Sequence, residues 1–129
     1  MIKNLSHVSL TYKNYIKVKK FYVNILGLKI VHKFKNKKGF TYGLFLGCGK
    51  QTFLEFFRKN NRKQTKFFHF CFNVKNIDEV KKKLIKFDKN IKVKRGKTDK
   101  ILQIMTQDFE GNLVEFHQFD NKAKSFFIK

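Results

Sequence analysis

Residues 113–117 read Leu-Val-Glu-Phe-His, a short apolar stretch interrupted by Glu115. A matching stretch at 53–57 reads Phe-Leu-Glu-Phe-Phe and carries Glu55. Side chains alternate across a strand, so each glutamate points away from the apolar residues next to it in sequence. Because a carboxylate within an apolar strand is costly unless its charge is compensated, both glutamates are candidate functional residues.

Each glutamate follows a histidine at nearly the same distance. His7 precedes Glu55 by 48 residues, and His69 precedes Glu115 by 46. Both histidines also lie in strand-like stretches, although the chain has only four histidines and nine carboxylates. Two imidazoles and two carboxylates suit a divalent ion such as Ni, Co, Zn, Mn or Fe, in an octahedral site with two positions left for water or substrate. We therefore expect these four residues to be metal ligands.

The repeat extends to the elements between these residues. Apolar residues at a helical period predict one helix in each half, at 13–26 and 76–88, with Gly27 and Asn76 as caps. Alternating segments bounded by turn residues predict strands near 6–10, 28–35, 40–48, 51–58, 66–74, 90–95, 100–107 and 112–119. The sequence therefore predicts an α+β fold, with a single domain over 1–129 made of two βαβββ modules at about 1–60 and 66–120.

Strand alternation divides the predicted strands into two faces. One face is uniformly apolar and is expected to pack on the helices, through Ile16, Phe21, Ile25 and Leu26 in the first and Ile77, Val80, Leu84 and Phe87 in the second. The other face is expected to line a cavity. Besides the four ligands, it carries the candidate substrate contacts Ser9, Phe53, Phe57, Cys71 and His117.

The composition of the chain argues for a folded, non-membrane protein without a disulfide framework. A chain of 129 residues with 42% hydrophobic residues and seventeen Phe is long enough to bury a core. It has no apolar run that could cross a bilayer and no apolar signal-peptide core, so a cytoplasmic location without membrane contact is expected. Cys48 and Cys71 lack a Cys-x-x-Cys spacing and are expected to be free thiols.

The net charge of +21 results from thirty basic and nine acidic residues; the basic residues are spread along the chain, and all but three of them are Lys. This even spread indicates a compositional bias and does not predict a specific nucleic-acid surface. A generally positive field still favours anionic small molecules. The loop at 94–100, which contains Lys94, Arg95 and Lys97, is a candidate rim for an anionic substrate tail.

These residues resemble the vicinal oxygen chelate superfamily, which has the glyoxalase and bleomycin-resistance fold. His7-Val8-Ser9-Leu10 and Phe21-Tyr22-Val23-Asn24-Ile25-Leu26-Gly27-Leu28 resemble its opening His strand and its Phe-Tyr-x-x-x-Leu-Gly-Leu helix end. Residues 108–118, Asp-Phe-Glu-Gly-Asn-Leu-Val-Glu-Phe-His-Gln, resemble its closing Asp-Pro-x-Gly-Asn-x-x-Glu turn and strand, with Phe109 where Pro is usual. The resemblance implies a curved mixed sheet around a metal-binding cavity, and substrates bound through two neighbouring oxygens.

The resemblance also implies a metalloenzyme similar to lactoylglutathione lyase, with one Ni, Co, Zn or Mn ion per site, that works as a homodimer. Such enzymes isomerise the hemithioacetal of methylglyoxal and a thiol. Glu115 matches the base that takes a proton from carbon, and Glu55 would return it. Glutathione-specific members carry Arg where this chain has Ser9 and Asn where it has Arg58 and Lys59, so the thiol stays open.

Three alternatives share the fold. Epimerisation of an acyl thioester uses the same carboxylate pair, although that family usually has Gln in place of Glu55. Thiol transfer to fosfomycin is disfavoured by Glu55 and by the lack of an Arg soon after Glu115. A non-catalytic antibiotic-binding protein needs no filled ligand set, and a positive protein would repel cationic drugs of the bleomycin type.

Overall fold

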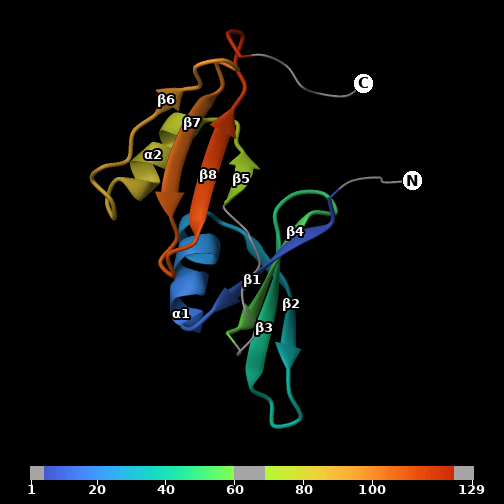
Figure 1. Cartoon of the computed structure of the whole chain (residues 1–129). Coiled ribbons are helices and arrows are strands. Elements are labelled where there is room, and N and C mark those ends of the chain that lie inside the picture. Colours follow the sequence, from blue (N-terminus) through green and yellow to red (C-terminus); the bar gives the residue numbers. More distant parts are fainter. Residues whose placement is uncertain (1–4, 60–68, 124–129) are drawn as a thin grey trace. The chain divides into compact units, whose positions relative to one another are not determined.

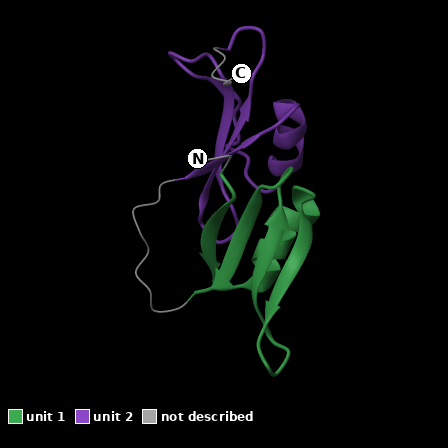
Figure 2. Cartoon of the chain, turned by 90° about the vertical axis from the view of Figure 1, so that its right-hand side faces the viewer, with its two compact units in different colours: residues 1–65 green, residues 66–129 purple. Residues whose placement is uncertain are grey.

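The computed structural model describes residues 5–59 and 69–123 of the chain. The chain divides into two compact units, Met1–Thr65 and Lys66–Lys129, which Figure 2 distinguishes by colour. Within the described residues, each unit contains one four-stranded mixed sheet and its own helical segment. The α+β fold with two modules, predicted from the repeat, is thereby confirmed.

Unit 1 follows the predicted order of elements (Figure 1). It contains β1 (His7–Tyr12), α1 (Tyr15–Val18), the π-helix η1 (Lys19–Ile25), β2 (Lys29–Lys35), β3 (Thr41–Gly47) and β4 (Phe53–Arg58). The strands lie in the order β1-β4-β3-β2, with β1 parallel to β4 and the other neighbours antiparallel. The first and last strands of the unit, which carry His7 and Glu55, are therefore adjacent.

Unit 2 repeats this arrangement with β5 (Phe70–Asn73), α2 (Ile77–Leu84), β6 (Lys94–Arg95), β7 (Leu102–Gln107) and β8 (Leu113–Gln118). The order is β5-β8-β7-β6, and β5 runs parallel to β8. Two boundaries differ from the prediction. His69 lies just before β5, the first residues of the predicted strand at 66–68 are outside the described residues, and the strand expected at 90–95 is reduced to two residues.

The first helix differs from a regular α-helix. It begins after Asn14, whose Oδ1 accepts a hydrogen bond from the backbone N–H of Ile16 at 2.9 Å, and continues as a π-helix from Lys19. The prediction that Ile16 packs inward is wrong, because this side chain is 73% exposed while Val18 is buried. Residues two apart lie on opposite sides of a helix, and the wider π turns then change the spacing on which the prediction rested.

Helix α2 begins as predicted at Asn76, whose Oδ1 accepts from the backbone N–H groups of Asp78 and Glu79. The helix ends at Leu84, so Phe87 lies beyond it, is 48% exposed and contacts the ring of Phe109. The expected inward position of Phe87 in the helix is therefore wrong. No helix among the described residues is long and apolar enough to cross a membrane.

The apolar sheet faces form the core of each unit, as predicted. In unit 1, the ring of Tyr22 from η1 lies 4.9 Å from that of Phe56 on β4, and both side chains are fully buried. In unit 2, Ile104 on β7 and Val114 on β8 are fully buried on the face covered by α2 (Figure 1). The opposite face of each sheet is consequently free to carry polar side chains.

A tight turn fixes the start of β8. The buried carboxylate of Asp108 accepts hydrogen bonds from the backbone N–H groups of Glu110 and Asn112 and from the side-chain amide of Asn112, each at 2.8 Å. Gly111 has a φ of 87°, which favours glycine. This turn fixes where β8 begins, at Leu113. It thereby determines on which face of the sheet the side chain of Glu115 lies.

Candidate metal centre

In unit 1, His7 and Glu55 lie together on the face of the sheet opposite the core. Nε2 of His7 is 3.8 Å from Oε1 of Glu55, across the parallel pair β1 and β4. The His7 side chain is 41% exposed and the Glu55 side chain 18%. Strand alternation places both on this face because Leu10 and Leu54, which have the opposite parity, are buried.

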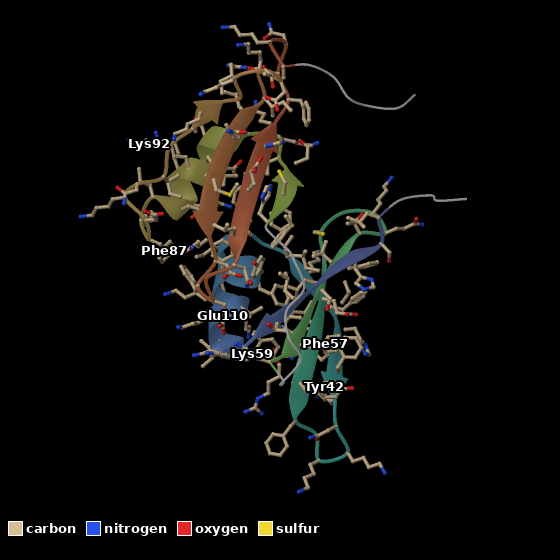
Figure 3. The ribbon with its side chains drawn as sticks, in the orientation of Figure 1. Tyr42, Phe57, Lys59, Phe87, Lys92 and Glu110 are labelled. Carbon is tan, nitrogen blue, oxygen red and sulfur yellow. The ribbon has the colours of Figure 1, made fainter. Side chains whose placement is uncertain are left out.

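Aromatic rings surround this pair. The ring of Phe45 lies 5.7 Å from that of His7 and 4.6 Å from that of Phe53. Farther along the same face, Phe57 stacks on Tyr42 with ring centroids 6.2 Å apart (Figure 3). Phe53 and Phe57, predicted as substrate contacts, thus belong to a half-buried aromatic surface beside Glu55. Ser9 is exposed and is the register partner of Glu55 on β1.

In unit 2, one carboxylate has two imidazoles as neighbours. Nε2 of His69 is 3.1 Å from Oε2 of Glu115, and Nε2 of His117 contacts Oε1 of the same carboxylate. Glu115 is 9% exposed, and Nε2 of His117 is inaccessible to solvent. No Lys or Arg among the described residues pairs with Glu115, despite the large excess of Lys in the chain.

Cys71 completes this group. It is the register partner of Glu115 across the parallel pair β5 and β8. The ligand atoms of Cys71, Glu115 and His117 all lie within 4.8 Å of one another. Desolvation of the thiol, reinforced by the Glu115 carboxylate, raises the pKa of Cys71 to about 12, although a backbone hydrogen bond from His117 acts in the opposite direction. Cys48, the other free thiol, lies in unit 1.

The donor chemistry of unit 2 fits a divalent metal, while unit 1 contributes one imidazole and one carboxylate. A buried carboxylate surrounded by imidazole nitrogens and a thiol is an arrangement that transition-metal sites use. The structure brings His7 to Glu55 and His69 to Glu115, as the spacing suggested. It also adds Cys71 and His117 to the second pair, where the sequence suggested substrate contacts. The roles of these residues as ligands stay predictions.

The face that carries Glu115 continues across β7 to a cavity of about 370 Å³. Met105 is the register partner of Glu115, Gln103 that of His117, and Lys94 that of Gln103. These side chains therefore share one face of the sheet. The cavity is lined by Asn90, Lys92, Lys94, Gln103 and Met105, of which Figure 3 labels Lys92.

Of the residues lining this cavity, Lys94 belongs to the loop at 94–100 that the sequence suggested as an anion rim, and the other four were not singled out. Arg95, which was predicted as an anion contact, lies next to Lys94 on a strand and so faces the other side of the sheet. Its guanidinium forms two hydrogen bonds with Asp120, at 3.0 and 2.9 Å, and a third with the carbonyl oxygen of Lys100. Lys97 is exposed in the following turn. The sequence does not show the register of β6 against β7, which places Lys94 and not Arg95 on the face of the cavity.

Comparison with known proteins identifies the family. The sequence model of the Glyoxalase/Bleomycin resistance protein/Dioxygenase superfamily matches residues 4–116. No curated protein sequence matches the chain significantly. Among solved structures, a glyoxalase family protein from Enterococcus faecalis is 24% identical, with a TM-score of 0.68 over 89% of this chain and 97% of that chain.

Two further structures share the fold at lower identity. Lactoylglutathione lyase from Agrobacterium tumefaciens is 22% identical, with a TM-score of 0.65 over 91% of this chain and 94% of that chain. A mutant of the fosfomycin resistance protein FosX from Listeria monocytogenes, complexed with Mn(II) and 1S,2S-dihydroxypropylphosphonic acid, is 20% identical, with a TM-score of 0.69 over 95% and 97%. The family match spans both units, and it agrees with the motifs at both ends of the chain. The chain therefore belongs to the glyoxalase/bleomycin resistance protein/dioxygenase superfamily.

Proposed function

We propose that this protein is a metal-dependent isomerase of the glyoxalase I type, acting on the adduct of an α-oxoaldehyde and a thiol. The observation that carries the proposal is the buried carboxylate of Glu115, which has imidazoles as neighbours and no Lys or Arg partner among the described residues. Its counterpart in unit 1 is Glu55, beside His7. The proposed ligands of a Ni, Co, Zn or Mn ion are His7, Glu55, His69 and Glu115.

The two glutamates would move the protons of the reaction. Glu115 takes a proton from the carbon that bears the thiol, and Glu55 delivers a proton to the neighbouring carbon. The first carbon ends as a thioester and the second as an alcohol, so the isomerisation needs no external oxidant or reductant. When bound, the metal ion supplies positive charge that stabilises negative charge developing on the substrate oxygens.

The cavity beside Glu115 supports an anionic substrate. Lys92 and Lys94 place two positive charges in it, and Gln103 and Asn90 add hydrogen-bonding groups. Lys94 shares a sheet face with Glu115 through Gln103 and His117. We propose that this cavity receives the negatively charged end of the substrate. The phosphonic acid in the FosX complex is also an anion, which makes chemical modification of fosfomycin the second candidate function.

One set of assays tests these activities. The metal-free protein is loaded with Ni, Co, Zn or Mn, and thioester formation is followed from methylglyoxal hemithioacetals of glutathione and of smaller thiols. We expect isomerisation with at least one metal and one thiol, and a loss of about 100-fold or more in kcat in Glu115→Gln. Glu110→Gln is the matched control, since Glu110 lies in the turn before β8 (Figure 3).

The proposal would be wrong if a preparation with bound metal isomerised none of these adducts, or if an active preparation kept full activity in Glu115→Gln. Fosfomycin and the same thiols are tested in parallel. Consumption of fosfomycin without isomerisation of the adducts would favour the second candidate. Binding of an antibiotic without turnover of any substrate would favour the non-catalytic alternative.

A further inference from the structure

The two units differ in the residues that follow the paired ligands by two positions. On the face that carries His7 and Glu55, these positions hold Ser9 and Phe57. On the face that carries His69 and Glu115, they hold Cys71 and His117. A thiol and an imidazole are strong transition-metal ligands, whereas a hydroxyl is a poor one and a phenyl ring is not a ligand. Unit 2 therefore carries donors that its counterpart lacks.

The fold brings these extra donors together. Cys71 lies opposite Glu115 on the neighbouring parallel strand, and His117 lies two residues after Glu115 on the same strand. Their ligand atoms and that of Glu115 lie within 4.8 Å of one another. Ligands of a single tetrahedral zinc ion lie roughly 3–4 Å apart, given bond lengths of about 2.0–2.3 Å. Small side-chain rotations would thus bring all three to one ion.

The surroundings also suit a cation. Nε2 of His117 is inaccessible to solvent and contacts Oε1 of Glu115, so these two donor groups lie together in a largely buried position next to the exposed Cys71. Among the described residues, the ion-pair neighbours of Glu115 are imidazoles, which are positively charged only when protonated. The carboxylate is buried with no Lys or Arg partner among residues 5–59 and 69–123, in a protein of net charge +21. A bound divalent ion would supply the missing positive charge.

We propose that Cys71 and His117 join Glu115 as direct ligands of a thiophilic ion, Zn²⁺ or Co²⁺, so that unit 2 holds a Cys-His-Glu metal site. This deepens the proposed function and rests on its metal-binding part. Soft sulfur ligands favour zinc and cobalt over manganese and magnesium. The site would consequently select zinc or cobalt. It shares Glu115 and His69, whose Nε2 lies 3.1 Å from Oε2 of Glu115, with the ligand set of the proposed function.

Cobalt titration of the full chain tests the thiolate directly. Sulfur bound to Co²⁺ gives an intense near-ultraviolet charge-transfer band that oxygen and nitrogen ligands do not give. We expect this band in the native protein, its loss in Cys71→Ser, and its loss when Zn²⁺ is added to displace cobalt. Cys48→Ser is the matched control, because Cys48 lies in unit 1 with its thiol directed at the carbonyl oxygen of Thr52.

Competition between metals measures the selectivity. We expect the preference for Zn²⁺ over Mn²⁺ to fall at least about 10-fold in Cys71→Ser, since even residues that only support a ligand contribute about 10–100-fold to metal affinity. His117→Gln should weaken Zn²⁺ binding by a similar factor and leave the sulfur band in place at saturating cobalt. A preference unchanged by both substitutions would overturn the proposal.

A measurement on the unsubstituted protein avoids dependence on the folding of variants. Alkylation of both thiols is followed by mass spectrometry, with and without Zn²⁺. We expect Zn²⁺ to slow the reaction of Cys71 at least about 10-fold and to leave that of Cys48 unchanged, because a zinc-bound thiolate is protected. Protection of neither cysteine, or a cobalt band that persists in Cys71→Ser, would overturn the proposal.

The experiments distinguish a failure of the proposed Cys71 ligand from a failure of the proposed isomerase activity. Cobalt binding without a sulfur band, together with isomerase activity, would remove Cys71 from the ligand set and leave the His-Glu centre in place. A sulfur band without isomerisation of any adduct would support the thiolate site and count against the proposed reaction.

Discussion

The ring of Phe57 on β4 lies so close to Gly43 on β3 that Gly43 has no room for a side chain. A Cβ at Gly43 would come 2.6 Å from Cδ1 of Phe57 and 2.9 Å from the backbone oxygen of Phe56. The glycine therefore allows Phe57 to lie across the neighbouring strand and to stack on Tyr42 (Figure 3). This contact shapes the aromatic surface beside Glu55.

Gly43→Ala should destabilise the protein by about 1–3 kcal/mol, because the Phe57 ring and the backbone of β4 must both move. Gly47→Ala is the matched control on the same strand, where a Cβ would meet Cγ1 of Val31 at 3.3 Å and the side chain can yield. The free energy of unfolding in urea measures both. Equal losses in the two variants would show that the Phe57 contact is not the cause.

The strand faces could be predicted from the sequence because alternation is a local property. Glu115 lies between Val114 and Phe116, and both neighbours are buried as their parity requires. The turn at Asp108 and the cap at Asn76 were likewise readable, since each makes its hydrogen bonds within four residues. Element order and the candidate ligands therefore followed from short-range patterns.

The residues that are brought together by pairing between strands could not be predicted from short-range patterns. The register of β6 against β7 decides whether Lys94 or Arg95 lies on the face of the sheet that carries Glu115. A shift of one residue would exchange the two. The gathering of Cys71 at Glu115 depends on the register of β5 against β8 in the same way. Ile16 was misplaced because a π-helix follows the first helical turn, and the sequence gives no clear signal for it.

The lysines of the cavity provide a second prediction. Lys94→Gln and Lys92→Gln should each raise the KM for an anionic thiol adduct several-fold and leave kcat nearly unchanged, because they remove attraction felt equally by substrate and transition state. Lys82→Gln on the exposed side of α2 makes the same change in net charge and controls for it. Steady-state kinetics at two salt concentrations measure the effect. The same rise in KM in Lys82→Gln would assign it to overall charge.

The ion pair of Arg95 and Asp120 predicts how stability depends on acid. Hydrogen bonding to Arg95, followed by backbone hydrogen bonds from Lys122 and Ala123, lowers the pKa of Asp120 from 3.8 to about 2. A carboxyl with a depressed folded pKa contributes stability above the unfolded pKa and loses that contribution as the pH falls through the folded pKa. The contribution should therefore be complete above about pH 4 and be lost between about pH 4 and pH 2.

Urea midpoints between pH 2 and pH 6 measure this effect. Asp120→Asn should be less stable than the native protein at pH 6 and approach it at pH 2. Arg95→Met should lose the larger part of this acid dependence and keep the remainder, because the backbone hydrogen bonds from Lys122 and Ala123 still lower the pKa of Asp120. Parallel curves for the native protein and Asp120→Asn over the whole range would contradict the assignment.

Metal binding should stabilise the folded protein, and the two units should contribute unequally. An ion that binds only the folded state adds about 2.7 kcal/mol at a free concentration 100 times its Kd. The donors around Glu115 outnumber those around Glu55, since unit 2 offers two imidazoles and a thiol and unit 1 offers one imidazole. Glu115→Gln should therefore abolish most of the rise in Tm caused by Zn²⁺, and Glu55→Gln should abolish less of it.

Thermal unfolding with Zn²⁺ or with a chelator measures this difference, and Glu110→Gln controls for the loss of a carboxylate near Glu115. The comparison of the two variants is informative, because a site made only of His7, Glu55, His69 and Glu115 would predict equal effects of Glu115→Gln and Glu55→Gln. A larger effect of Glu115→Gln would show that Cys71 and His117 add to the affinity at their end of the donor set. Equal effects would indicate that Cys71 and His117 add nothing and that the two His-Glu pairs contribute equally. If no metal raised the Tm, metal binding by either unit would be contradicted.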